Sequence, residues 1–361
     1  MSRTVDRPLL AVILILVFVG ALVISSASVV ISDSNFSTMY YYTLRHLLYI
    51  SIGLLVLFIA SRLPYKIWRK LSLLMIIFAL FLMALVFFPG VGFRHGGAAR
   101  WLNLGFFSLQ PAEFLKIALV AYLASWLASR NSSPKDTYRA FLPFVVILGV
   151  VSVFLILQPD IGTLLVIVFC ATVLYFLGGG KISQIASLIA LGVFAMAVLV
   201  QLAPYRLARF AVFLNPDIDI SGIGYHIRQA MIAIGSGGFW GRGYGQGLQK
   251  YNYLPEPIGD SVFAVTVEEF GFLGAMILIG LFVFFIWRSI FIARSAPDIF
   301  SKLVVAGLTA SIGFQAFLNM GAISGLLPLT GIPLPFISYG GTAIVMTLFG
   351  AGIILNVSRH T

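Results

Sequence analysis

Residues 254–292 read LPEPIGDSVFAVTVEEFGFLGAMILIGLFVFFIWRSIFI, a short polar segment that leads directly into a long apolar run. A helix needs about 20 apolar residues to cross a hydrocarbon core of roughly 30 Å, and the run that starts at residue 262 exceeds this length. Three acids, Asp260, Glu268 and Glu269, stand at or inside the edge of this predicted span. Because charge is costly at membrane depth, these acids are candidates for a function.

The composition of the whole chain is that of an integral membrane protein. Of its 361 residues, 60% are hydrophobic and 10% are charged, and the mean hydropathy is +1.04. The apolar runs are too long and continuous for barrel strands, so helices must satisfy the backbone. We therefore predict an all-α polytopic membrane protein with about ten transmembrane helices, formed as a single domain over residues 1–361. The predicted spans are 9–31, 45–63, 71–88, 112–129, 141–157, 161–178, 183–203, 262–292, 300–324 and 337–357.

Lysine and arginine set the predicted orientation. Most of the 23 basic residues fall in short, densely basic loops on the side of the N-terminus, which the positive-inside rule places in the cytoplasm together with the C-terminus. One large extracytoplasmic loop, about 204–260, then joins spans seven and eight. The net charge of +11 mostly reflects the cytoplasmic clusters, so it does not indicate nucleic-acid binding.

The large loop contains aromatic and apolar residues, so we expect it to fold onto the membrane surface as short helices. Arg206 and Arg209 stand near its start. They either anchor lipid headgroups or bind a pyrophosphate, whose oxygens match the fork of a guanidinium group. A glycine-rich run at 235–247 allows tight turns or a close approach to a bound headgroup.

Two further charged positions carry alternative interpretations. Glu113 and Lys116 are three residues apart in a predicted span and share a helix face. They form either a structural pair or the lining of a polar cavity in which Lys116 faces a phosphate. Asp160, in the segment QPDIGT, either caps the following helix or contacts a substrate or metal.

Asp260 itself could cap the eighth span. We favour a chemical role because Glu268 and Glu269 follow in an apolar helix, where at least one must face protein or water. Ser338, in the segment GIPLPFISYGG, starts the last span and either packs or lines the cavity. The single cysteine, Cys170, offers no disulfide or thiolate metal site, and the chain contains no Ser/His/Asp, zinc or P-loop pattern.

These segments together resemble the SEDS family, the FtsW/RodA/SpoVE-type polytopic membrane proteins of bacterial cell-wall synthesis. The resemblance covers nearly the whole chain, and its motifs occur in order: SSAS, GGAARWLNLGFFSLQPAEFLK, QPDIGT, YRLARFAVFLNP, GRGYGQGLQKYNYLPEPIGDSVFAVTVEEFGFLG and GIPLPFISYGG. RLPYKIWRKLS followed by PGVGF resembles the FtsW, or divisional, branch more than RodA. The segment PEPIGDSVFAV departs from the family pattern before Asp260 but keeps the acid in register.

The resemblance implies a peptidoglycan glycosyltransferase that polymerises lipid II on the outer face of the bacterial cytoplasmic (inner) membrane, in cell division or related wall synthesis. Asp260 matches the essential aspartate of the family, and Glu113 and Lys116 match its acid and lysine on the fourth span. The implied partners are lipid II, a class B penicillin-binding protein and other divisome or elongation proteins.

The implied chemistry needs one general base. Lipid II is an α-linked sugar pyrophosphate and the product is β-linked, so one inversion requires no covalent nucleophile. Asp260 would accept the proton of the attacking hydroxyl, and basic residues or a divalent cation (Mg²⁺ or Mn²⁺) would meet the charge of the leaving pyrophosphate. The residues predicted to bind the substrate are Glu113, Lys116, Asp160, Arg206, Arg209, Glu269 and Ser338. Two alternatives remain, a lipid II flippase or transporter and a non-catalytic scaffold for a penicillin-binding protein.

Overall fold

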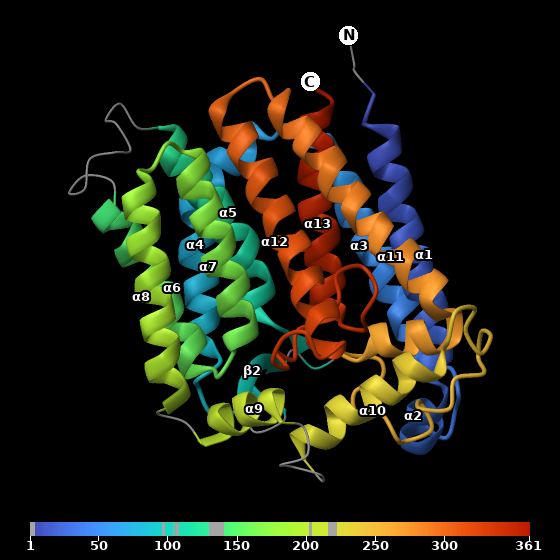
Figure 1. Ribbon diagram of the computed structural model, residues 1–361. Coiled ribbons are helices and arrows are strands. Elements are labelled where there is room, and N and C mark those ends of the chain that lie inside the picture. The colour runs from blue at the N-terminus through green and yellow to red at the C-terminus, as the bar shows by residue number, and fades with distance from the viewer. Residues whose placement is uncertain are drawn as a thin grey trace.

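The computed structural model describes residues 4–95, 98–103, 105, 108–129, 141–201, 204–215 and 222–361. In these ranges the chain forms a bundle of long helices with both termini at the same end (Figure 1). Seven helices are long and apolar enough to cross a membrane: α1 (Arg7–Ala27), α3 (Tyr41–Arg62), α4 (Lys66–Leu85), α5 (Pro111–Ala128), α11 (Val262–Arg294), α12 (Ile299–Ile323) and α13 (Gly341–Ser358). Three apolar helices are shorter or have a shorter apolar part: α6 (Leu142–Leu157), α7 (Ile161–Leu177) and α8 (Ile182–Gln201).

Each predicted span coincides with one of these helices, so the helical class of the prediction is confirmed. The expectation of an all-α chain is nevertheless incomplete. The first outer loop forms a three-stranded antiparallel sheet, with β1 (Gly92–His95), β2 (Ala98–Asn103) and β3 (Ser108–Leu109) in that order. Strands this short give too few residues for an alternating pattern to be read. The Arg100 guanidinium Nε donates to the Gln158 carbonyl (3.0 Å) and ties the sheet to the turn between α6 and α7.

Three short helices lie across the end of the bundle opposite the termini (Figure 1). They are α2 (Val29–Phe36), α9 (Pro204–Leu214) and α10 (Ile223–Ser236). The last two come from the long loop, so the expectation that this loop forms short helices is confirmed. Residues 216–221 of the same loop lie outside the described part of the chain.

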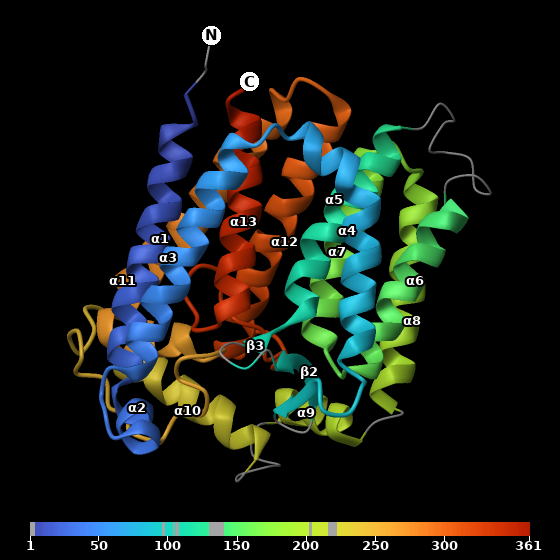
Figure 2. The ribbon, with the colours of Figure 1, turned by 180° about the vertical axis from the view of Figure 1, so that it is seen from behind.

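Helix α12 occupies the centre of the bundle, where it packs against α5, α7, α11 and α13. Behind it, α13 packs against α3 (Figure 2). This approach is close because Gly352 has no side chain, and a Cβ there would lie 2.7 Å from the Leu57 carbonyl oxygen. Large apolar side chains such as Leu74 and Phe194 remain exposed on the sides of the bundle, as expected for a surface in contact with lipid.

Candidate active site

Asp260 lies in the turn before α11, at the end of the bundle opposite the termini. The carbonyl oxygens of residues 258, 259 and 260 each accept a hydrogen bond from another part of the chain. The donors are the Tyr339 N–H (2.8 Å), the Ser338 hydroxyl (2.7 Å) and the Asn319 side-chain amide (2.8 Å), in that order. The backbone of this turn is therefore fixed by α12 and by the segment before α13.

The Asp260 carboxyl takes no part in this support. Helix α11 has Ser261, not Asp260, at its N-cap position. The Oδ1 atom of Asp260 is buried and has no hydrogen-bond partner among the described residues. The capping alternative thus does not apply to Asp260, and a rigid backbone presents a carboxyl oxygen that is available for chemistry.

The surroundings of Asp260 favour the protonated form. Burial raises its pKa to about 7; the neighbouring Glu256 carboxylate adds to the rise, and the Arg209 guanidinium opposes it. Burial is the largest of these effects, and the opposing cation near the carboxyl is Arg209. A carboxyl that is about half ionised near neutral pH is suited to act as a general base.

His226, on α10, is a residue of this site that the sequence analysis did not identify. Its Nε2 atom lies 2.6 Å from the Ser261 hydroxyl and 4.0 Å from Oδ1 of Asp260. The Ser261 hydroxyl donates to the Pro255 carbonyl (2.7 Å), so Nε2 must be the donor to Ser261 and carries the proton. Burial and, second, the charge of Arg209 lower the pKa of His226 to about 4, so the ring is neutral at pH 7.

The two arginines predicted to bind the substrate, Arg206 and Arg209, both belong to α9. The Nη1 atom of Arg209 donates to the Leu329 carbonyl (3.3 Å), which holds the guanidinium within electrostatic range of Asp260. The side chain of Arg206 lies outside the described residues. Pyrophosphate binding by either arginine stays a prediction.

Glu113 and Lys116 form a buried ion pair on α5, with Nζ 2.9 Å from Oε1. The Lys116 ammonium also donates to Oε1 of Gln315, whose Nε2 donates to the Pro333 carbonyl (2.9 Å). The pair lines a cavity of about 20 Å³, which is enough for roughly one water molecule. Lys116 is therefore paired rather than free, and it is linked through Gln315 to the segment that holds Asp260.

Asp160 caps α7, because its Oδ1 accepts from the backbone N–H of Thr163 (3.1 Å). Its other oxygen lies 3.5 Å from Nε2 of Gln110, at the start of α5. The structure thus gives Asp160 the capping role that the sequence offered as one alternative, and contact with a substrate stays a prediction.

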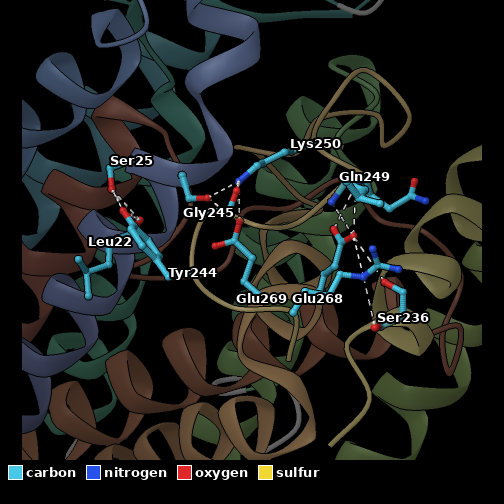
Figure 3. A network of polar contacts seen from close by, with 12 residues as sticks. Leu22, Ser25, Ser236, Tyr244, Gly245, Gln249, Lys250, Glu268 and Glu269 are labelled. Carbon is cyan, nitrogen blue, oxygen red and sulfur yellow. Dashed lines mark hydrogen bonds and ion pairs between the residues drawn. The ribbon is translucent and has the colours of Figure 1, made fainter. Parts of the chain in front are cut away.

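Glu268 and Glu269 are both buried, where the sequence required at least one to face inward. They hold the loop from 236 to 250 against α11 (Figure 3). Glu269 pairs with Lys250 (2.7 Å) and accepts from the Ser26 hydroxyl on α1. Glu268 accepts from the backbone N–H of Leu248 (2.8 Å) and faces the guanidinium of Arg242. These contacts give Glu269 a role in holding the loop, and its contact with a substrate stays a prediction.

The same loop enters a break in α11 at Gly271, where φ is 69° and ψ is −168°. Around this break the N–H groups of Arg242 and Gly243 donate to the carbonyls of residues 268 and 269 (both 3.0 Å). In return, the Phe272 N–H donates to the Gly238 carbonyl (2.9 Å). The glycine-rich run therefore allows a close approach to the backbone of α11, and an approach to a bound headgroup stays a prediction.

A metal site is not evident in the described ranges. Within them no three His, Cys, Asp or Glu side chains converge in a way that could hold a metal ion. Because Mg²⁺ can be held by one or two carboxylates together with substrate phosphates, a divalent cation at this site stays a prediction, and no chemical step is assigned to such an ion. Asp217 and Asp219 lie outside the described residues.

Comparison with known proteins connects this arrangement to a family. The FtsW/RodA/SpoVE family model, described as "Cell cycle protein", matches residues 6–361. Stage V sporulation protein E of Bacillus subtilis (strain 168) is 40% identical over 359 residues, which cover 99% of this chain and 97% of that protein. The probable peptidoglycan glycosyltransferase FtsW of Coxiella burnetii is 38% identical over 363 residues, which cover 100% of this chain and 98% of the relative.

Solved structures share the fold. A chain of a peptidoglycan synthase complex, studied for the coordination of polymerization and crosslinking, is similar with a TM-score of 0.80 and 29% identity over 98% of both chains. The rod shape determining protein RodA of Thermus thermophilus is similar with a TM-score of 0.73 and 27% identity, over 98% of this chain and 97% of RodA. With a family match over nearly its entire length and full-length relatives at 38–40% identity, the chain belongs to the FtsW/RodA/SpoVE family.

Proposed function

We propose that this chain is a peptidoglycan glycosyltransferase that polymerises lipid II on the outer face of the bacterial cytoplasmic membrane, with Asp260 as the general base. One observation carries the assignment of Asp260. Three successive carbonyls fix its backbone, while its Oδ1 is buried without a hydrogen-bond partner among the described residues. The names of the relatives support the activity: FtsW of Coxiella burnetii is a probable peptidoglycan glycosyltransferase.

In the proposed reaction, the ionised Asp260 carboxylate accepts the proton of the acceptor sugar hydroxyl. The oxygen then forms a bond to the anomeric carbon of the donor, and the bond from that carbon to the pyrophosphate breaks with inversion. The leaving group departs with the electron pair, and its negative charge is met by the guanidinium of Arg209. His226 donates its Nε2–H to Ser261 and packs beside the carboxyl, with Nε2 4.0 Å from Oδ1 of Asp260.

The proposed topology has ten spans, formed by the seven long helices and by α6, α7 and α8. Both termini are then cytoplasmic, and Asp260 faces the extracytoplasmic side. The basic residues that cluster near the termini support this orientation. The similar chain that works in a peptidoglycan synthase complex supports a class B penicillin-binding protein as the partner.

The test is glycan-strand formation from labelled lipid II by the purified full-length chain with a cognate class B penicillin-binding protein. Asp260→Asn keeps the size of the side chain but cannot accept the proton, so we expect no polymer. Asp298→Asn is the matched control, because Asp298 caps α12 at the opposite end of the bundle and asparagine also caps helices. Asp298→Asn should polymerise like the wild type.

Equal polymer from wild type and a folded Asp260→Asn would contradict the role of Asp260. If neither the wild type nor the variants form polymer, but the chain moves lipid II across vesicle membranes, the result would instead favour a transporter. If the partner itself forms the polymer, and forms the same amount with Asp260→Asn as with the wild type, the chain is a scaffold.

A further inference from the structure

A second cavity lies on the side of the bundle, away from the Asp260 site. Its volume is 560 Å³, within the range of roughly 300–1,000 Å³ that is usual for small-molecule sites. Its walls come from α7, α11 and α12, with α12 at the back because it packs against both of the other helices. Figure 1 shows these three helices beside one another. The small side chains Ala306 and Ala310, one turn apart on α12, leave the space open.

The cavity is a groove that opens toward the surroundings of the bundle. The rings of Phe169 of α7 and Phe314 of α12 stack with centroids 3.9 Å apart. They close the groove at the end farther from the termini. Phe169 and Leu177 on one rim and Ile290 on the other are each about two-fifths exposed. In a membrane this opening faces lipid chains, so an apolar occupant can enter from the side.

The two basic side chains of the groove lie at one end of it. Arg294 ends α11 and Lys302 lies in the first turns of α12, both at the end of the bundle that holds the termini. Both are exposed, and neither forms an ion pair with an acid in the part of the chain that the structure describes. Asp298, in the turn between them, is occupied by the Tyr65 hydroxyl (2.6 Å) and the Ser301 N–H (2.8 Å).

The dimensions of the groove fit one lipid leaflet. Lys302 and Phe314 are 12 residues apart on α12, which is roughly 18 Å at about 1.5 Å per residue. One half of a hydrocarbon core is about 15 Å thick. The groove therefore extends from the headgroup level, where the two cations lie, to about the middle of the membrane, where the stacked rings end it.

We propose that this groove binds one anionic phospholipid from the leaflet on the side of the termini. One acyl chain lies along Ala306 and Ala310, and the phosphate lies beside Arg294 and Lys302. The charge complementarity selects an anionic headgroup, because guanidinium and ammonium groups are the usual partners of phosphate oxygens. A zwitterionic lipid would bring its own cation close to these two side chains.

The test measures retention of dioleoyl phosphatidylglycerol by the detergent-purified full chain in native mass spectrometry, with dioleoyl phosphatidylcholine as the comparison lipid. Each basic residue near an anionic lipid strengthens binding by roughly fivefold, so R294Q/K302Q should bind phosphatidylglycerol about 25-fold more weakly. The matched control is K66Q/K70Q. It removes two exposed cations from the start of α4, which lies at the same end because the Tyr65 N–H donates to Asn356 on α13.

A third variant tests the chain-binding part of the groove. Ala306→Phe fills the space but leaves both cations, so it should also release phosphatidylglycerol. Three results would overturn the proposal: unchanged binding in R294Q/K302Q, an equal loss in K66Q/K70Q, or equal retention of phosphatidylcholine by the wild type. Full binding by Ala306→Phe would show that the lipid lies on the surface and not in the groove.

Discussion

Replacement of Asp260 by asparagine should make the protein more stable at neutral and alkaline pH. The pKa of Asp260 is about 7 in the folded protein and 3.8 by reference, so the folded state binds this proton more tightly than the unfolded state. Above pH 7 the ionised carboxylate therefore lowers the free energy of unfolding, by up to about 4 kcal/mol for a pKa of about 7. The side chain is 16% exposed, which makes this value an upper limit.

The pH window follows from the same two values. A carboxyl with a raised pKa costs no stability below about pH 4, where both states are protonated, and the cost grows as the pH rises through 7. We would follow thermal unfolding of the detergent-purified chain by tryptophan fluorescence at about pH 3.5 and about pH 8. Asp260→Asn should unfold at a higher temperature than the wild type at the higher pH and at nearly the same temperature at the lower one.

Asp298→Asn provides a control of opposite sign. Burial raises the pKa of Asp298, but the hydrogen bonds from Tyr65 and Ser301 outweigh burial and leave the pKa below its ordinary value. The ionised form of Asp298 is thus favoured by folding, so its asparagine variant should be less stable than the wild type near neutral pH. A gain for Asp260→Asn that is absent, or equal at both pH values, would refute the electrostatic reasoning.

Three further predictions concern the site and its support. The rate of polymerisation should rise with pH through about 7 as Asp260 ionises. Glu256→Gln should move the midpoint of this pH–rate profile to lower pH, because the Glu256 charge raises the pKa of Asp260. Lys250→Met should cost roughly 3–5 kcal/mol of stability by leaving Glu269 buried and unpaired, and a second change, Glu269→Gln, should restore most of it in thermal unfolding. Gly271→Ala should lower the unfolding temperature. A non-glycine residue with φ of 69° costs about 1–3 kcal/mol, and the new Cβ would lie 2.3 Å from the backbone nitrogen of Gly241. An unchanged unfolding temperature would mean that the break in α11 is not required.

The sequence predicted the membrane helices well because their signal is strong. Long apolar runs between short polar segments place helix ends to within a few residues, and the structure differs most at the start of α4, at Lys66 instead of residue 71. The small sheet was missed because strands of two to six residues carry no readable period. The buried acids of α11 were identified for the same reason as the helices, since charge in an apolar run is conspicuous.

The partners of those acids could not be predicted from local patterns. Lys250 pairs with Glu269 across 19 residues, and His226 meets Asp260 across 34 residues of loop. Nothing in the sequence near Lys250 or His226 sets either residue apart from the other basic residues of the loop. Asn319 did carry a signal, because an amide in an apolar helix needs a partner, and its side chain holds the Asp260 carbonyl.

The break at Gly271 separates two mechanical units within one helix. Residues 262–270 follow Asp260 directly, whereas residues 272–294 form the longer part of α11, and the loop that follows α10 is hydrogen-bonded to both sides of the break. When a span tilts to match a thinner or thicker bilayer, a residue outside the helical ladder can absorb the rotation. We therefore expect Gly271 to be the residue of α11 at which such a rotation is absorbed.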